Sequence, residues 1–218
     1  MKLVIFDLDE TLVNFFAVHD KAFGSTLEEL FGIKGASYKD IDYRGKRIPD
    51  SITEYARMKG VAQKTIDTNL ERAERVYELH FARLMRNPKK HILAGVIPLL
   101  KELSKKHKLA LVTADIPGVT ALVLDGTGLL RYFKFVVTAD DAPTRPELVA
   151  KAIKKAGKVD EVWVVGDSVR DIDAGNANEA KVIAVLTGGT PEKTLAEHKP
   201  AYIFKDLTLL KKIVGVIG

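Results

Sequence analysis

The sequence contains no cysteine, and this absence excludes several kinds of chemistry. Disulfides, thiolate metal sites and cysteine nucleophiles all need the missing side chain. A chain without cysteine suits a reducing compartment, so we expect a cytoplasmic protein. No apolar run approaches the roughly 18 residues that a membrane-spanning helix needs, and no signal-peptide pattern precedes the first apolar stretch. We therefore expect no membrane partner.

A strong excess of one charge is also missing. The chain has 34 Lys and Arg residues against 29 Asp and Glu residues, a net charge of +5. Nucleic-acid-binding proteins place basic clusters among exposed aromatic residues, whereas the Lys-Lys pairs here are scattered, so we expect no nucleic-acid partner. Most of the positive excess falls between residues 14 and 91, which hold 15 basic and 11 acidic residues. This segment is the part of the chain that favours an anionic ligand.

What is present is the composition of a globular protein, with 46% hydrophobic and 29% charged residues in a chain of 218. From residue 95 onward, short apolar runs alternate with helical segments of about ten residues, a pattern typical of βαβ units and a parallel sheet. Strands are predicted at residues 2–6, 108–113, 133–138, 161–166, 181–186 and 201–204.

The spacing of these strands predicts an insertion. The later strands follow one another at intervals of roughly 20 to 28 residues, but about 100 residues separate the first strand from the second. A crossover needs only a dozen or more residues. We therefore predict an α/β fold, a Rossmann-like parallel sheet with helices on both faces, formed by residues 1–13 and 92–218. Residues 14–91 form an inserted helical cap, with helices at 16–31, 50–58 and 66–84.

Polar residues follow four of the predicted strands at their carboxyl ends. Ligands of open α/β sheets bind at that edge, so these side chains are expected to meet there. They are Asp7, Asp9, Thr113, Arg145, Asp167 and Asp171. A single aspartate at such a place often only caps a turn, but the full set favours a functional site.

Other residues of similar type lie off this pattern. Asp115 and Asp173 are interpreted as helix caps. The five histidines show no metal-ligand spacing and are interpreted as surface or packing residues.

In order and spacing, these residues resemble the haloacid dehalogenase superfamily of hydrolases. The resemblance rests on DxDxT at Asp7–Thr11, Thr113 after its strand, Arg145-Pro146, and GDSxxD at Gly166–Asp171. It covers nearly the whole chain and is nearest to phosphatases with a helical (C1-type) cap, similar to phosphoglycolate phosphatases and β-phosphoglucomutases. It implies Mg²⁺-dependent hydrolysis of a small phosphorylated metabolite, such as phosphoglycolate or a sugar phosphate, through an aspartyl-phosphate.

The resemblance also implies a role for each motif residue. Asp7 would attack phosphorus, and Asp9 would protonate the leaving oxygen and then activate water. Mg²⁺ would be held by the carboxylates of Asp7 and Asp167, the backbone carbonyl of Asp9 and, directly or through water, Asp171. The phosphoryl group would be bound and its charge balanced by Thr113, Ala114 and Arg145.

Two departures from the family pattern leave alternatives open. Most relatives have Lys where this chain has Arg145, and Asn or Gly is common where it has Ala114. Phosphonoacetaldehyde hydrolases are among the relatives with Arg, and such a phosphonatase would need a cap lysine, for which Lys21 and Lys46 are available. A non-catalytic module that binds a phosphorylated ligand is the other alternative. The presence of Asp9 counts against a true dehalogenase.

The predicted cap contains a basic stretch, RGKRIPD, at residues 44–50. Similar caps present a specificity loop there, so Arg44, Lys46 and Arg47 are candidates to bind a second anionic group of the substrate. An exposed basic loop with no ligand is the equally weighted alternative. For the assembly we expect a monomer or a homodimer.

Overall fold

The strands form one six-stranded sheet in the order β3-β2-β1-β4-β5-β6, and every neighbouring pair is parallel. The computed structural model describes all residues, Met1–Gly218. The strands are β1 (Leu3–Phe6), β2 (Lys108–Val112), β3 (Phe135–Val137), β4 (Val162–Gly166), β5 (Lys181–Val185) and β6 (Tyr202–Phe204). The first strand lies in the centre of the sheet, between β2 and β4, so the predicted parallel Rossmann-like sheet is confirmed.

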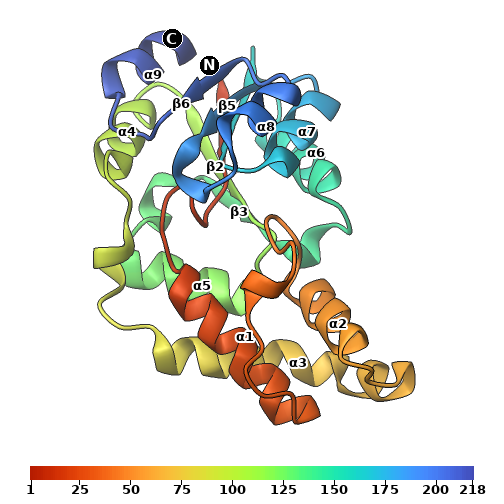
Figure 1. The fold of residues 1–218 in the computed structure, drawn as a ribbon. Coiled ribbons are helices and arrows are strands. Elements are labelled where there is room, and N and C mark those ends of the chain that lie inside the picture. The colour runs from red at the N-terminus through yellow and green to blue at the C-terminus, as the bar shows by residue number, and fades with distance from the viewer.

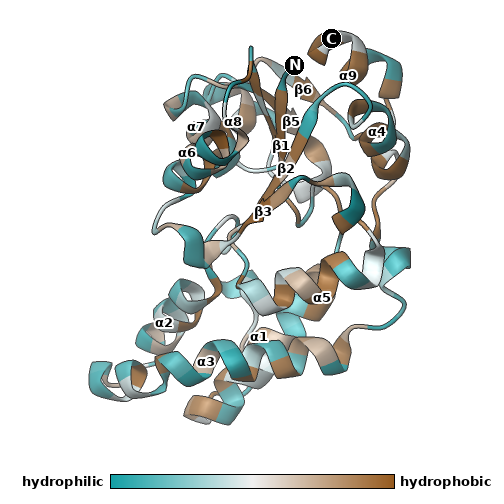
Figure 2. Cartoon of the chain, turned by 180° about the vertical axis from the view of Figure 1, so that it is seen from behind, coloured by the Kyte–Doolittle hydropathy of each residue, from teal (hydrophilic) through white to brown (hydrophobic).

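Helices cover both faces of this sheet (Figures 1 and 2). They are α4 (Val96–Leu103), α6 (Arg145–Ala156), α7 (Val169–Ala177), α8 (Glu192–Glu197) and α9 (Leu210–Ile217). Helix α5 (Pro117–Thr127) instead lies below the sheet in Figure 1, against the helix at residues 63–84. Because side chains alternate along a strand, Leu3 and Ile5 of β1 pack with α6 and α7, whereas Val4 and Phe6 face the opposite layer. The strands are accordingly brown, or hydrophobic, in Figure 2.

Three helices lie beyond the carboxyl edge of the sheet, in the lower half of Figure 1. They are α1 (Phe16–Phe31), α2 (Ile48–Met58) and α3 (Gln63–Leu84), and all come between β1 and β2 in the chain. We call residues 14–91 the cap and the rest the core, although these boundaries stay a prediction. Helix α2 begins two residues earlier than expected, with Pro49 in its first turn, where the missing N–H of proline costs nothing.

The cap is packed onto the core by apolar contacts. Inside it, Phe23 stacks on Tyr38 with ring centroids 4.0 Å apart and meets Tyr55 edge-on. These aromatic residues belong to the same cluster of 39 buried residues as Val4 and Phe6 of the sheet. The hydrophobic core therefore continues from the sheet into the cap without a break.

The two chain crossings between core and cap are tied to each other. Val13 and Ile92 form an antiparallel bridge. The amide of Asn14 donates to the carbonyl of His91 at 2.8 Å, and Nδ1 of His91 donates back to the carbonyl of Asn14 at 2.7 Å. The crossings are therefore one paired connection rather than two separate linkers.

One predicted strand is shorter than expected. The strand predicted at 133–138 is reduced to Phe135–Val137, because short 3₁₀ turns at Leu130–Tyr132 and Ala139–Asp141 occupy the chain on either side. None of the helices is both long enough and apolar enough to cross a bilayer.

Candidate active site

The polar residues predicted to meet do meet, at the carboxyl edge of the three central strands. Asp7, Thr113 and Asp167 directly follow β1, β2 and β4, which are neighbours in the sheet. All six predicted core residues line one cavity of about 90 Å³: Asp7, Asp9, Thr113, Arg145, Asp167 and Asp171.

Arg145 joins two of the carboxylates. Its guanidinium contacts Oδ1 of Asp7 and lies 2.5 Å from Oδ1 of Asp171. Its position is set locally, because Thr144 and Glu147 form a capping box that starts α6 at Arg145. The arginine side chain is only 8% exposed, and the two carboxylates raise its pKa above the usual range although burial opposes the shift.

The other carboxylates are also held by core residues. Thr11 donates its hydroxyl proton to Oδ1 of Asp167 at 2.9 Å. Ser168 donates to Oδ2 of Asp171 through its amide, at 3.1 Å, and its hydroxyl, at 2.6 Å, in the capping box of α7. Gly188 closes over Asp167, since a Cβ atom at this glycine would lie 1.7 Å from Oδ2 of Asp167. The aspartates are therefore fixed by hydrogen bonds and by close packing.

This part of the site has more negative than positive charge. Asp7, Asp167 and Asp171 bring carboxylate oxygens within 4.8 Å of one another, with Arg145 as their one direct cationic partner. Burial raises the pKa of Asp7 to about 7 although Arg145 opposes the shift. Burial and the neighbouring carboxylates also raise the pKa of Asp167 well above its usual range. An oxygen-only donor set with surplus negative charge fits a hard divalent cation such as Mg²⁺.

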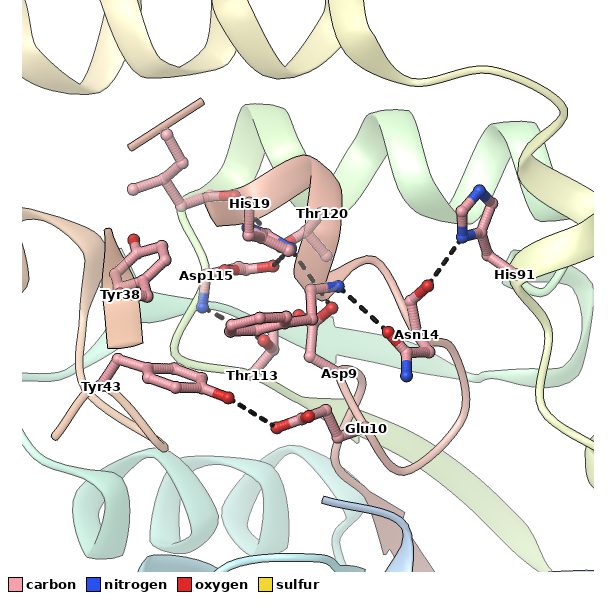
Figure 3. Close-up of polar contacts among 12 residues, drawn as sticks. Asp9, Glu10, Asn14, His19, Tyr38, Tyr43, His91, Thr113, Asp115 and Thr120 are labelled. Carbon is pink, nitrogen blue, oxygen red and sulfur yellow. Dashed lines mark hydrogen bonds and ion pairs between the residues drawn. The ribbon is translucent and has the colours of Figure 1, made fainter. Parts of the chain in front are cut away.

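A second polar group lies between core and cap (Figure 3). Nε2 of His19, on α1, lies 3.3 Å from Oδ1 of Asp9 and 3.9 Å from Oδ2 of Asp115. Burial alone would lower the pKa of His19, but the two carboxylates raise it to about 9. Burial would likewise raise the pKa of Asp9, but the neighbouring His19 holds it below its usual range. Burial and Asp9 raise the pKa of Asp115 well above its usual range.

His19 and Asp115 were missed by reasoning from the sequence. The interpretation of Asp115 as a helix cap is wrong, because its carboxyl group is buried in the cavity wall beside Asp9. His19 does pack inside the protein as expected, but it also faces the cavity. The signal for His19 was its helical spacing with Phe16 and Phe23, which places His19 on the apolar face of α1. The signal for Asp115 was its position two residues after Thr113.

Thr113 and Ala114 line the floor of the cavity next to these residues. The Thr113 hydroxyl accepts a hydrogen bond from the amide of Asp115 at 3.1 Å. This contact holds the backbone that follows β2 in a tight turn against the site.

The cap supplies the opposite wall, which combines aromatic and cationic side chains. Tyr43 donates its hydroxyl proton to Glu10 at 3.4 Å, and Arg44 lies over the Tyr43 ring, 5.2 Å from its centroid. Nε of Arg44 donates to the carbonyl of Gly188 at 3.1 Å. Lys46 also lines the cavity and pairs with Glu54 at 2.5 Å.

The three basic residues predicted for this wall are not equivalent. Arg44 and Lys46 line the cavity, whereas Arg47 lines only an adjoining groove. Of the two lysines considered for a phosphonatase, Lys21 is exposed and outside the cavity lining, so only Lys46 is near the site.

Comparison with known proteins gives a consistent picture. The family model described as haloacid dehalogenase-like hydrolase matches residues 4–185. The chain is 27% identical to the pyrophosphatase PpaX of Bacillus pumilus over 97% of this chain and 95% of that protein. It is 28% identical to a phosphoglycolate phosphatase of Pseudomonas savastanoi over 96% of this chain and 78% of that protein.

Solved structures with the same fold cover the full length of the chain. A hydrolase from Pseudomonas syringae matches with a TM-score of 0.81 and 23% identity over all of both chains. A predicted phosphoglycolate phosphatase from Haemophilus somnus matches with a TM-score of 0.78 and 21% identity over 97% of both. These likenesses extend the agreement in fold to the cap as well as the sheet.

Proposed function

Since the chain belongs to the haloacid dehalogenase-like hydrolases, we propose that it is a Mg²⁺-dependent phosphatase acting on a small phosphorylated metabolite. One observation carries the proposal. Asp7 and Asp9, two residues apart, reach the same cavity but face different partners, Arg145 with the acidic cluster for Asp7 and His19 for Asp9. Two carboxylates in unlike surroundings are suited to two different roles.

Asp7 is the nucleophile in this proposal. Arg145 contacts Oδ1 of Asp7, which leaves Oδ2 as the oxygen free to attack. A bond forms between this oxygen and phosphorus while the ester P–O bond breaks, and an aspartyl-phosphate results. Arg145, together with the backbone near Thr113 and Ala114, stabilises the charge of the transferring group.

Asp9 moves the proton in both halves of the reaction. Asp9 has to be protonated when substrate is bound, so the negative charge of the phosphate must offset the lowering of its pKa by His19. It then donates this proton to the leaving alcohol oxygen, and the resulting carboxylate takes a proton from water. That water attacks phosphorus, releases inorganic phosphate and regenerates Asp7. The side chain of Asp9 is 29% exposed, against 14% for Asp7, as access to water requires.

The carboxylates of Asp7, Asp167 and Asp171 and the backbone carbonyl of Asp9 are proposed to hold Mg²⁺. When bound, the ion offsets the negative charge that would otherwise keep a phosphate dianion away from Asp7. The surplus of buried carboxylates over cations supports this assignment.

We propose that Arg44 and Lys46 bind a second anionic group of the substrate, because both line the cavity. Phosphoglycolate has a carboxylate and pyrophosphate has a second phosphate, so the names of two relatives are consistent with such a substrate. A planar guanidinium over Tyr43 is well suited to pair with a carboxylate.

The test is a metal-dependent phosphatase screen. Purified protein is incubated with Mg²⁺ and a panel of phosphoglycolate, pyrophosphate, sugar phosphates and p-nitrophenyl phosphate, and released phosphate is measured. Asp7→Asn is expected to reduce kcat on the order of a thousandfold or more, while the exposed Asp125→Asn serves as the matched control. Full activity in Asp7→Asn, or tight binding without phosphate release by the unaltered protein, would contradict the proposal.

A further inference from the structure

The four site carboxylates are not held in the same way. Asp7, Asp167 and Asp171 each have a charged or hydrogen-bonding partner from the core. Oδ1 of Asp9, in contrast, is buried and has no hydrogen bond. Nε2 of His19, which belongs to the cap, lies 3.3 Å from it.

The direction of the His19 ring is fixed from inside the cap. Its Nδ1 atom lies 2.8 Å from the hydroxyl of Tyr77 on α3, and its ring packs on Phe81 with centroids 4.6 Å apart. The contact with Tyr77 leaves Nε2 as the ring nitrogen that faces Asp9.

Asp115 completes the arrangement from the core side. Its Oδ2 atom, Nε2 of His19 and Oδ1 of Asp9 are all buried without hydrogen bonds, and they converge on one another (Figure 3). A buried polar group without a partner is costly, so three such atoms side by side are compensated by mutual contact. Asp115 therefore approaches the same ring nitrogen of His19 that faces Asp9.

We propose that His19 is a positioning residue for Asp9, with Asp115 and Tyr77 holding the imidazole in place. The inference rests on the proposed function, since it concerns the carboxyl group that carries the proton there. A misplacement of a catalytic group by about 1 Å can cost about a hundredfold in rate. The orientation of Asp9 should therefore matter, and it should matter most for substrates whose leaving group needs a proton. The cap thus contributes to the chemical step as well as to substrate choice.

The experiment compares two substrates, in the unaltered protein and in His19 variants, whose leaving groups differ in their need for a proton. p-Nitrophenolate leaves readily without one, whereas the alkoxide of an alkyl phosphate does not. The comparison uses kcat/KM, because this constant covers only the steps up to release of the alcohol. His19→Asn keeps a polar atom for Tyr77 but is too short to reach Asp9, whereas His19→Gln places an amide near the position of Nε2.

For His19→Asn we expect a loss in kcat/KM of tenfold to a hundredfold with an alkyl phosphate and at most threefold with p-nitrophenyl phosphate. His19→Gln should retain most of the alkyl phosphate activity. Asp115→Asn should show the same selective loss, smaller in size, and adding it to His19→Asn should cause little further loss because the two residues act through one contact. His80→Gln, which alters a cap histidine paired with Glu29, is the control.

Circular dichroism and thermal unfolding identify variants that fold. Should His19→Asn fail to fold, the same selective loss is required of Asp115→Asn. Equal losses for both substrates, or no rescue by His19→Gln, would overturn the inference and leave the phosphatase assignment intact. An unaltered protein that releases phosphate from neither substrate would overturn both.

Discussion

Core and cap contribute to the same cavity in different ways. In the core, the site residues come directly after neighbouring parallel strands and are bound to one another, as Arg145 is to Asp7 and Thr11 is to Asp167. In the cap, His19 and Arg44 reach the cavity from a helix and a loop whose placement depends on packing against the core. Under the proposed function, the core residues would carry out the reaction, and the cap residues would select the substrate and surround Asp9.

Among the changes that compare core with cap, the largest effect is expected from disturbing the core cluster through its backbone. Gly188→Ala would place a methyl group 1.7 Å from Oδ2 of Asp167, so either the carboxylate or the backbone must move. We expect a loss of kcat of about a hundredfold and a loss of stability of about 1–3 kcal/mol. Gly215→Ala, where the new methyl group meets no atom within 4 Å, should be neutral or slightly stabilising. Equal activity in the two variants would show that the cluster tolerates displacement.

The core cluster should also govern stability against pH in metal-free protein. The pKa of Asp7 rises from its ordinary 3.8 to about 7 on folding, so the folded state binds more protons between these values. The free energy of unfolding should therefore fall as pH rises from 3.8 to about 7. Urea unfolding in EDTA measures this slope, which Mg²⁺ should flatten and Asp7→Asn should reduce. A slope that is unchanged in Asp7→Asn would contradict the prediction.

Arg44 and Arg47 allow the cap wall to be tested separately. Arg44→Ala removes a charged donor from the cavity, so KM for a substrate with a second anionic group should rise by about tenfold, with kcat little changed. Arg47→Ala is the matched control, because Arg47 lines only the adjoining groove. p-Nitrophenyl phosphate, which has no second anion, should be affected by neither change. A larger rise in KM for Arg47→Ala than for Arg44→Ala would mean that Arg47, and not Arg44, binds the second anionic group.

The smallest effect concerns the contact between cap and core at alkaline pH. The pKa of His19 rises from 6.5 to about 9 in the folded state, so its contribution to stability is complete below pH 6.5. That contribution should disappear as pH rises through about 9. The slope between pH 6.5 and 9 should be absent in His19→Gln and retained in His80→Gln. Equal slopes in these two variants would mean that another group titrates.

Much of the core could be predicted from the sequence because its signals are local. An apolar run followed by Asp7, Thr113 or Asp167 predicts a strand and a residue at its carboxyl end, and the parallel sheet then brings these ends together. The insertion could also be predicted, because about 100 residues precede β2 and a crossover needs only a dozen or more. Arg145 could be placed because Pro146, a residue suited to the first turn of a helix, marks the start of its helix.

The cap side of the site could not be predicted in the same way. Which face of α1 meets the core depends on how the whole cap packs, so His19 could not be distinguished from a packing residue. Likewise, Arg44 and Arg47 are three positions apart on one basic stretch, and only the folded loop separates them. Asp115 was misinterpreted because its burial depends on the same packing of the cap.

The paired crossing at Val13 and Ile92 limits how the cap can move. Two antiparallel segments bridged to each other, and joined again by Asn14 and His91, resist sliding and twisting and leave mainly rotation about a single axis. Any such rotation would carry His19 and Arg44 away from the sheet edge together. In the proposed reaction, admission of substrate and alignment of Asp9 as proton donor would then share one degree of freedom, so Asp9 would be aligned only while the entrance is closed.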